Sequence, residues 1–223
     1  KDLFGDDEAS VKEALSRLGK SFDWMRSMVN QSFSMVEEKE ILAQGELMST
    51  ALMDIYLHKT GVNSVIIPAL DYVRTLENGE PDMKFISNRL LRELSINPDA
   101  DLYITQGYIC RNYKGEIDNL KRGGSDYTAS IIGAVIDAKE VQIWTDIDGM
   151  HNNDPRFVED TAPVGILHFE EAAELAYFGA KILHPSCVLP AKLHDIPVRL
   201  LNTLEPEAPG TLICTLPPTR SIT

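Results

Sequence analysis

Apolar residues recur at every third or fourth position in the first part of the chain, as they do along one face of an α-helix. Residues 6–40 are therefore predicted to be helical. The apolar stripe consists of Leu15, Leu18, Phe22, Met25 and Met28. A second helix is predicted from about residue 43 to residue 58, with Gly45 just before Glu46, so that this carboxylate lies in the first turn. Four further helices are predicted at residues 83–94, 125–136, 169–179 and 184–194.

Short runs of β-branched and aromatic residues between these helices have the composition of strands. They predict strands at residues 62–67, 101–108, 141–146, 197–202 and 210–214. Residues 112–118 have the character of a hairpin or loop. Because strands alternate with helices through most of the chain, we predict an α/β fold with a mainly parallel sheet covered on both faces.

The composition fits a globular protein and excludes some partners. The chain has 223 residues, 43% of them hydrophobic, which is enough for one large α/β domain or two small ones. Its net charge of −13 argues against binding to nucleic acid or to an anionic membrane, since both require clustered Lys and Arg. A small anionic substrate remains compatible where basic residues converge locally.

The cysteines and the hydrophobic runs indicate a cytoplasmic protein. Cys110, Cys187 and Cys214 stand alone, without a CxxC pair or a Cys/His metal spacing, which favours free thiols in a reducing cytosol. We find no apolar run long enough to span a bilayer and no signal-peptide pattern.

Residues 121–130 contain the clearest candidate for chemistry, a glycine turn that leads into a helix. Gly123 and Gly124 permit positive φ and close approach to a ligand, and Ser125 or Asp126 is expected to cap the helix. The N–H groups of a helix start favour an anion, and Arg122 adds a planar fork for a carboxylate or phosphate. The same residues also fit an ordinary glycine turn with a solvated Arg. For Glu46 the alternatives are a helix-start acid and an acceptor for a substrate ammonium group.

Four stretches together, in this order, resemble the aspartokinases. They are residues 44–49 (Gln-Gly-Glu-Leu-Met-Ser), 122–126 (Arg-Gly-Gly-Ser-Asp), 144–156 (Trp-Thr-Asp-Ile-Asp-Gly through Asp-Pro-Arg) and 178–185 (Phe-Gly-Ala-Lys-Ile-Leu-His-Pro). The resemblance covers about residues 40–214 and implies the amino-acid-kinase fold, a three-layer α/β/α sandwich. It also implies transfer of the γ-phosphoryl group of ATP to the β-carboxylate of L-aspartate.

The resemblance implies roles on the amino-acid side. Arg122 would hold a substrate carboxylate, Glu46 the amino group, and Gly123, Gly124 and Ser125 would line the pocket. Asp126 would act in catalysis by orienting the cations that bind the phosphates. These residues complement the two carboxylates and the ammonium group of L-aspartate.

On the nucleotide side, the resemblance assigns Thr145 and Asp146 to the ribose and adenine, and Arg156 to the nucleotide. Lys181 would meet the ATP phosphates as a catalytic residue, with Ile182 beside it. Outside the family context, Lys181 equally fits a solvated Lys after a helix end. Mg²⁺ is expected to arrive with ATP, and the sequence offers no protein cage for it.

Four departures from the family pattern stand out. His151 occupies a position where the family normally has Tyr, and Lys121 one where Gly is common. The family's N-terminal Lys-Phe-Gly-Gly-Thr-Ser strand is absent, as are the regulatory domains after the kinase domain. We therefore expect a truncated catalytic domain over residues 1–216, helical in residues 1–43, with residues 217–223 beginning a linker. We also expect a homo-oligomer.

Two other functions remain open. One is a related carboxylate kinase acting on glutamate or N-acetylglutamate, against which the Gln-Gly-Glu and Phe-Gly-Ala-Lys-Ile-Leu-His-Pro stretches argue. The other is a non-catalytic regulatory or binding subunit of the same fold, favoured by the missing N-terminal strand. The retained Arg122, Asp126 and Lys181 argue against that subunit.

Overall fold

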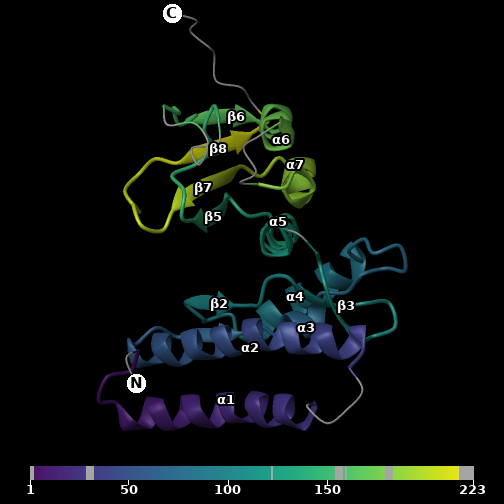
Figure 1. The fold of residues 1–223 in the computed structure, drawn as a ribbon, viewed down its shortest axis with the longest axis vertical. Coiled ribbons are helices and arrows are strands. Elements are labelled where there is room, and N and C mark those ends of the chain that lie inside the picture. The colour runs from purple at the N-terminus through teal and green to yellow at the C-terminus, as the bar shows by residue number, and fades with distance from the viewer. Residues whose placement is uncertain are drawn as a thin grey trace, which may run out of the picture. The chain divides into compact units, whose positions relative to one another are not determined.

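The computed structural model describes residues 3–28, 33–121, 123–153, 158, 160–178 and 183–215. Contacts divide the chain into two compact units, residues 1–119 and residues 120–223 (Figure 1). None of the described helices combines the length and the hydrophobicity that a membrane span requires.

Two long helices form the start of the first unit. Helix α1 (Glu8–Met28) begins after Asp7, whose carboxylate accepts the Ser10 backbone N–H at 3.2 Å. Helix α2 (Met35–Lys59) begins with a capping box, in which the Glu37 carboxylate accepts the Ser34 N–H at 2.9 Å. The prediction of one helix over residues 6–40 is therefore wrong, because the capping box starts a new helix after residue 34.

Helices α1 and α2 lie side by side in the first unit (Figure 1). Their apolar contact consists of Phe4, Ala14 and Ile55, with Val11 and Leu52 packed against them. A polar contact joins the same helices, since Arg17 Nη1 lies 3.1 Å from an oxygen of the buried Asp54.

The remainder of the first unit consists of two small sheets and two further helices. Strand β1 (Ser64–Ile66) pairs in parallel with β2 (Leu102–Ile104), and β3 (Ile109–Arg111) forms an antiparallel hairpin with β4 (Ile117–Asn119). Helix α3 (Ala69–Tyr72) follows β1, and α4 (Met83–Ile96) begins at the side-chain cap of Asp82. The strand predicted at residues 62–67 and the helix at residues 83–94 are confirmed. The strand predicted at residues 101–108 is shorter, since β2 ends at Ile104, and of the hairpin or loop predicted at residues 112–118 the structure has the hairpin.

The second unit contains a four-stranded sheet of order β5-β7-β8-β6. Its strands are β5 (Val141–Thr145), β6 (Ile166–His168), β7 (Val198–Asn202) and β8 (Thr211–Cys214). β5 is parallel to β7 and β6 to β8, whereas β7 and β8 are antiparallel. The predicted parallel pairing is therefore present, with one antiparallel step at the centre of this sheet.

The helices of the second unit are α5 (Gly124–Ile136), α6 (Phe169–Phe178) and α7 (Leu189–Leu193), with a 3₁₀ turn, η1, at Pro185–Val188. The single helix predicted at residues 184–194 is thus a 3₁₀ turn followed by a short α-helix. Their apolar faces pack on the sheet around Met150, Val198 and Leu200. The Ser130 hydroxyl of α5 accepts the Ala191 N–H at 2.9 Å, which fixes α7 against α5.

Candidate active site

The glycine turn at residues 121–124 adopts the conformation that its sequence predicts. Gly123 has φ of +70° and forms the N-cap of α5, while Lys121 before it has φ of +62°. The Gly124 N–H donates to the Lys121 carbonyl at 3.1 Å, which closes the turn. Ser125 and Asp126 therefore lie within the first turn of α5, and the prediction that one of them caps the helix is wrong. Gly123 is the N-cap without a side-chain hydrogen bond, because glycine readily adopts the left-handed backbone conformation that this turn requires.

Asp126 is the carboxylate of this first helical turn. It is half-buried, and burial raises the pKa of its carboxyl above the ordinary value of 3.8. Among the described residues its side chain has no hydrogen-bond or ion-pair partner. A desolvated carboxylate at this place favours a neighbouring cation, and the role of Asp126 in orienting cations stays a prediction.

Cys187 of η1 lies next to this carboxylate. The thiol is buried, and burial first and the Asp126 charge second raise its pKa to about 11. Cys187 is therefore a neutral thiol at physiological pH, without the thiolate that nucleophilic chemistry needs. Its part in the site is to pack against the glycine turn.

The carboxyl end of β5 forms a fixed turn. The Thr145 hydroxyl accepts the Ile147 N–H at 3.0 Å, and the Thr145 carbonyl accepts the Thr203 N–H at 2.7 Å. Asp146 is exposed beside them. The threonine thus holds the turn while the aspartate is left open to solvent, an arrangement able to offer a carboxylate to ribose hydroxyls.

His151 lies in the loop that follows, at 8% exposure. Its Nε2 lies 2.7 Å from an oxygen of Asp148 and its Nδ1 lies 2.9 Å from the Thr161 hydroxyl. The Val164 N–H donates to the Met150 carbonyl across the same loop at 2.7 Å. Both ring nitrogens are therefore occupied in closing the loop, and contact of His151 with a nucleotide stays a prediction.

Glu46 belongs to the first unit and lies inside α2, eleven residues after the helix begins at Met35. The prediction of a helix start near residue 43 is wrong, because α2 continues unbroken through Gly45 and carries the helix-disfavouring glycine internally. The side chain of Glu46 is half-buried. Within the part of the chain that the structure describes, its carboxylate has no hydrogen-bond or salt-bridge partner.

Four predicted site residues, namely Arg122, Arg156, Lys181 and Ile182, lie outside the described residues. Of the remainder, Glu46 belongs to the first unit, and Gly123, Gly124, Ser125, Asp126, Thr145, Asp146 and His151 belong to the second. In the second unit, the turn, Asp126 and η1 form one cluster, and the β5 end and its loop form another.

The sequence profile of the amino acid kinase family matches residues 7–202. The chain belongs to the amino acid kinase family. This match includes both predicted clusters and Glu46, so the motifs that carry the resemblance fall within the matched range.

Several proteins similar to this chain are aspartokinases. The chain is 36% identical over 207 residues to lysine-sensitive aspartokinase 3 of Escherichia coli, which covers 92% of this chain and 46% of that protein. It is 38% identical over 181 residues to the chloroplastic aspartokinase 1 of Arabidopsis thaliana, covering 78% of this chain and 32% of that protein. The chain thus spans half or less of the length of these relatives.

The fold is similar to that of E. coli aspartokinase III, whose crystal structure in complex with aspartate and ADP superposes with a TM-score of 0.84. The identity is 36%, and the match covers 94% of this chain and 47% of that chain. The predicted amino-acid-kinase fold is confirmed by this likeness.

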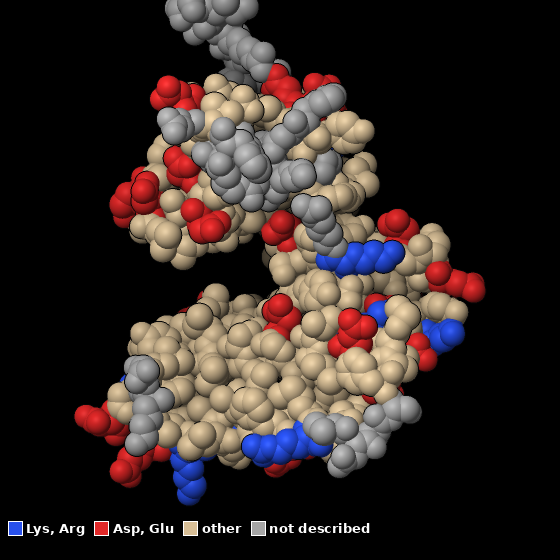
Figure 2. Space-filling view, viewed as in Figure 1, with Lys and Arg blue, Asp and Glu red and all other residues tan. Residues whose placement is uncertain are grey.

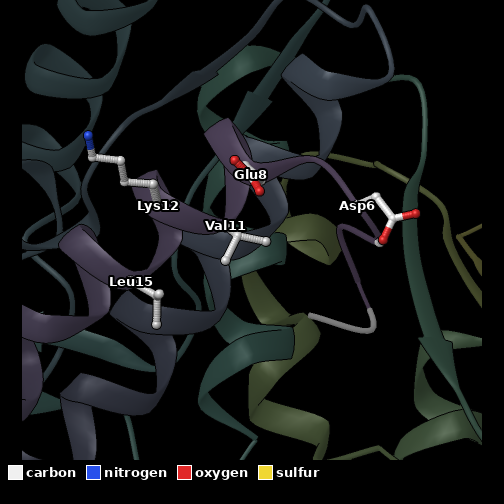
Figure 3. A pocket seen from close by; sticks show the side chains of 6 residues that line it. Asp6, Glu8, Val11, Lys12 and Leu15 are labelled. Carbon is white, nitrogen blue, oxygen red and sulfur yellow. The ribbon is translucent and has the colours of Figure 1, made fainter.

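Two cavities of the first unit lie beside α1, and Glu46 lines neither of them. One of about 360 Å³ is lined by Gly5, Asp6, Glu8, Val11, Lys12 and Leu15 (Figure 3). The other, of about 330 Å³, is lined by apolar side chains of α1, Leu52 of α2 and the preceding segment. In the first cavity the charged groups do not converge, since Figure 3 shows the Lys12 amine and the Asp6 carboxylate at opposite sides.

The charge distribution and the metal-binding residues complete the electrostatic description. Figure 2 shows Asp and Glu spread over the visible face, with Lys and Arg in small separate groups. Among the described residues no group of three or more His, Cys, Asp or Glu is arranged to hold a metal ion.

Sequence reasoning gave no role to Gln106, which the structure shows to be a buried polar residue at 2% exposure. It is the second residue after β2 and precedes Gly107. The available signal was an amide side chain between a parallel strand and a glycine, where polar groups commonly serve a ligand site.

Proposed function

We propose that this chain is the catalytic part of an aspartate kinase, which transfers the γ-phosphoryl group of ATP to the β-carboxylate of L-aspartate. The product would be 4-phospho-L-aspartate, the first intermediate towards lysine, threonine and methionine. The observation that carries the proposal is the likeness to a solved aspartokinase bound to aspartate and ADP, over 94% of this chain.

The chemistry of the described residues supports this reaction. Phosphoryl transfer needs positioning and neutralisation of negative charge, and little covalent participation by the protein. The helix start at Gly123 presents backbone N–H groups, which favour an anion. Asp126 beside it is a carboxylate without a partner among the described residues, as a residue that orients cations would be before ligands bind.

The substrate side rests on charge complementarity. Arg122 would hold one substrate carboxylate through two N–H groups, and Glu46 would accept from the substrate ammonium group. Thr145 and Asp146 at the β5 end would face the ribose and adenine, and Arg156 would contact the nucleotide. Lys181 would meet the ATP phosphates, with Ile182 beside it. Mg²⁺ bound to ATP would neutralise phosphate charge and stabilise the negative charge of the transition state. We further propose a cytoplasmic homo-oligomer.

The test is phosphorylation of L-aspartate by the full-length protein with Mg·ATP, with the acyl phosphate trapped as a hydroxamate. L-Glutamate and N-acetyl-L-glutamate are assayed in parallel. Product from L-aspartate alone is expected, and preference for either other acid would instead identify a related carboxylate kinase. ATP binding without any product would favour the non-catalytic subunit.

Arg122→Ala distinguishes the two halves of the site. The variant should raise KM for L-aspartate roughly 10- to 150-fold, since it removes a charge-assisted contact worth about 1.5–3 kcal/mol. KM for ATP should change little. Arg26→Ala is the matched control, because Arg26 is an exposed arginine of α1 whose partner is Asp23. Equal losses for both ligands would contradict the assignment of Arg122 to the amino acid.

A further inference from the structure

Gln106 connects three elements of the first unit through its side-chain amide. Its Oε1 accepts the Ala69 N–H at the start of α3, at 2.8 Å. Its Nε2 donates to the Thr50 hydroxyl of α2, at 2.7 Å. The Thr50 hydroxyl in turn donates to the carbonyl of Glu46 at 2.8 Å, or to that of Leu47 at 3.2 Å.

The direction of these hydrogen bonds is fixed by chemistry. The Ala69 N–H can only donate, so the oxygen of the Gln106 amide faces it and the nitrogen faces Thr50. The Thr50 hydroxyl accepts from that nitrogen, so its single proton is directed to the helix carbonyls, of which that of Glu46 is nearer. The three bonds therefore form one relay from Ala69 to the backbone of Glu46.

The relay fixes the turn of α2 that carries Glu46. A buried amide is costly to leave unsatisfied, so Gln106 resists any shift of α2 along β2 that would break its bond to Thr50. The carboxylate of Glu46 has no partner of its own among the described residues. Its position before a ligand binds therefore depends on the backbone, and the relay ends on that backbone.

We propose that Gln106 and Thr50 are positioning residues of the amino-acid site, which hold the Glu46 turn at the height from which its carboxylate meets the substrate ammonium group. This inference rests on the proposed function, because it takes the Glu46 role from the aspartate kinase reaction. Gln106 and Thr50 would thereby affect the affinity for the amino acid and not that for ATP.

The test compares KM for L-aspartate and KM for ATP in the full-length protein. Gln106→Met keeps the side-chain length and removes the relay, and Thr50→Val removes the hydroxyl at nearly constant shape. Both should raise KM for L-aspartate at least about fivefold and leave KM for ATP within about twofold. Thr50→Ser retains the hydroxyl and should leave both values within about twofold.

Gln106→Glu examines the direction of the relay. One carboxylate oxygen would still accept the Ala69 N–H, but the other would draw the Thr50 proton away from the Glu46 carbonyl. This variant should therefore resemble Gln106→Met in KM for L-aspartate, although its shape is almost unchanged.

Tyr72→Phe is the matched control. The Tyr72 hydroxyl lies 3.0 Å from that of Thr105, one residue before Gln106, so this variant removes a neighbouring bond between α3 and the β2 end without touching α2. Both KM values should stay unchanged.

The outcomes separate the two proposals. An unchanged protein that fails to phosphorylate L-aspartate would overturn the proposed function, and the inference with it. An active protein in which the Gln106 and Thr50 variants change both KM values equally, or lower only the melting temperature, would overturn the inference alone.

Discussion

A β-carbon at position 123 would lie 2.6 Å from Cys187 Sγ and 3.3 Å from the β-carbon of His184. The backbone of Gly123 is also left-handed, with φ of +70°. Space and backbone conformation therefore demand glycine independently. The helix start beside Asp126 is thus set by close packing of a loop against η1, as well as by the flexibility of glycine.

Gly123→Ala should lower the free energy of unfolding by on the order of 2–4 kcal/mol, since it adds a left-handed alanine to a steric overlap. Cys187→Ala should relieve only the overlap. Urea unfolding of the two single variants and the double variant would show a favourable coupling between the sites. Strict additivity of the two substitutions would mean that the thiol does not restrict position 123.

Asp126→Asn should stabilise the protein and abolish its activity. Because burial raises the pKa of Asp126, the charged form costs folding free energy at neutral pH, and the amide avoids that cost. We expect the melting temperature to rise and turnover to fall by about 100-fold or more.

The gain from Asp126→Asn should fade as the pH falls towards the ordinary carboxyl value of 3.8, because the native carboxyl then takes up its proton. Thermal melts of both proteins at several pH values test this. A variant that is less stable than the unchanged protein at pH 7 would mean that Asp126 has a stabilising partner.

Tyr72 should make folding sensitive to alkali. Its phenol is fully buried, and burial raises its pKa from 10.0 to about 12 against the opposing hydrogen bond with Thr105. The unfolded chain therefore loses this proton first, so its stabilising contribution is complete below pH 10 and disappears as the pH rises to about 12. The loss across this interval should be about 2–3 kcal/mol.

Tyr72→Phe lacks this phenol, so its free energy of unfolding should decline less between pH 10 and 12 than that of the unchanged protein. Denaturant unfolding at each pH gives the difference, to which the titration of lysines and thiols contributes equally in both proteins. Parallel curves for the two proteins would contradict the shifted titration.

His151→Ala should loosen the loop between Asp148 and Val164. The substitution removes both ring contacts and leaves the partly buried Thr161 hydroxyl without its His151 partner, at a cost of about 1–3 kcal/mol. Limited proteolysis should then cut this loop faster. His194→Ala, at an exposed histidine, should leave the cleavage pattern unchanged. If KM for ATP rises while proteolysis is unaltered, His151 acts on the nucleotide and not on the loop.

The positions of most strands and of α4, α5 and α6 followed from the sequence because each has a strong periodic or β-branched pattern. The break between α1 and α2 did not, although Ser34 and Glu37 carry the capping-box signal, because the apolar stripe continues across it. The helix start predicted near residue 43 was wrong because Gly45 was taken as a helix boundary. A long helix tolerates an internal glycine when its packing supplies the stability.

Other features depend on contacts that local patterns do not contain. Strand β6 has only three residues, and its pairing with β8 gives it strand character. The antiparallel step between β7 and β8 is likewise a choice of tertiary structure. In the candidate site, the glycine turn was predictable from its residue types. The hydrogen bonds of Gln106 were not, because they depend on the tertiary contact between the β2 end and α2.

Lys121 has a left-handed backbone conformation, which glycine adopts more readily. It has φ of +62°, a conformation that costs a non-glycine residue about 1–2 kcal/mol. A protein engineer has a direct use for such a position, since Lys121→Gly would exchange a strained residue for one that prefers this shape. Relief of this backbone strain would therefore stabilise the entrance to the glycine turn.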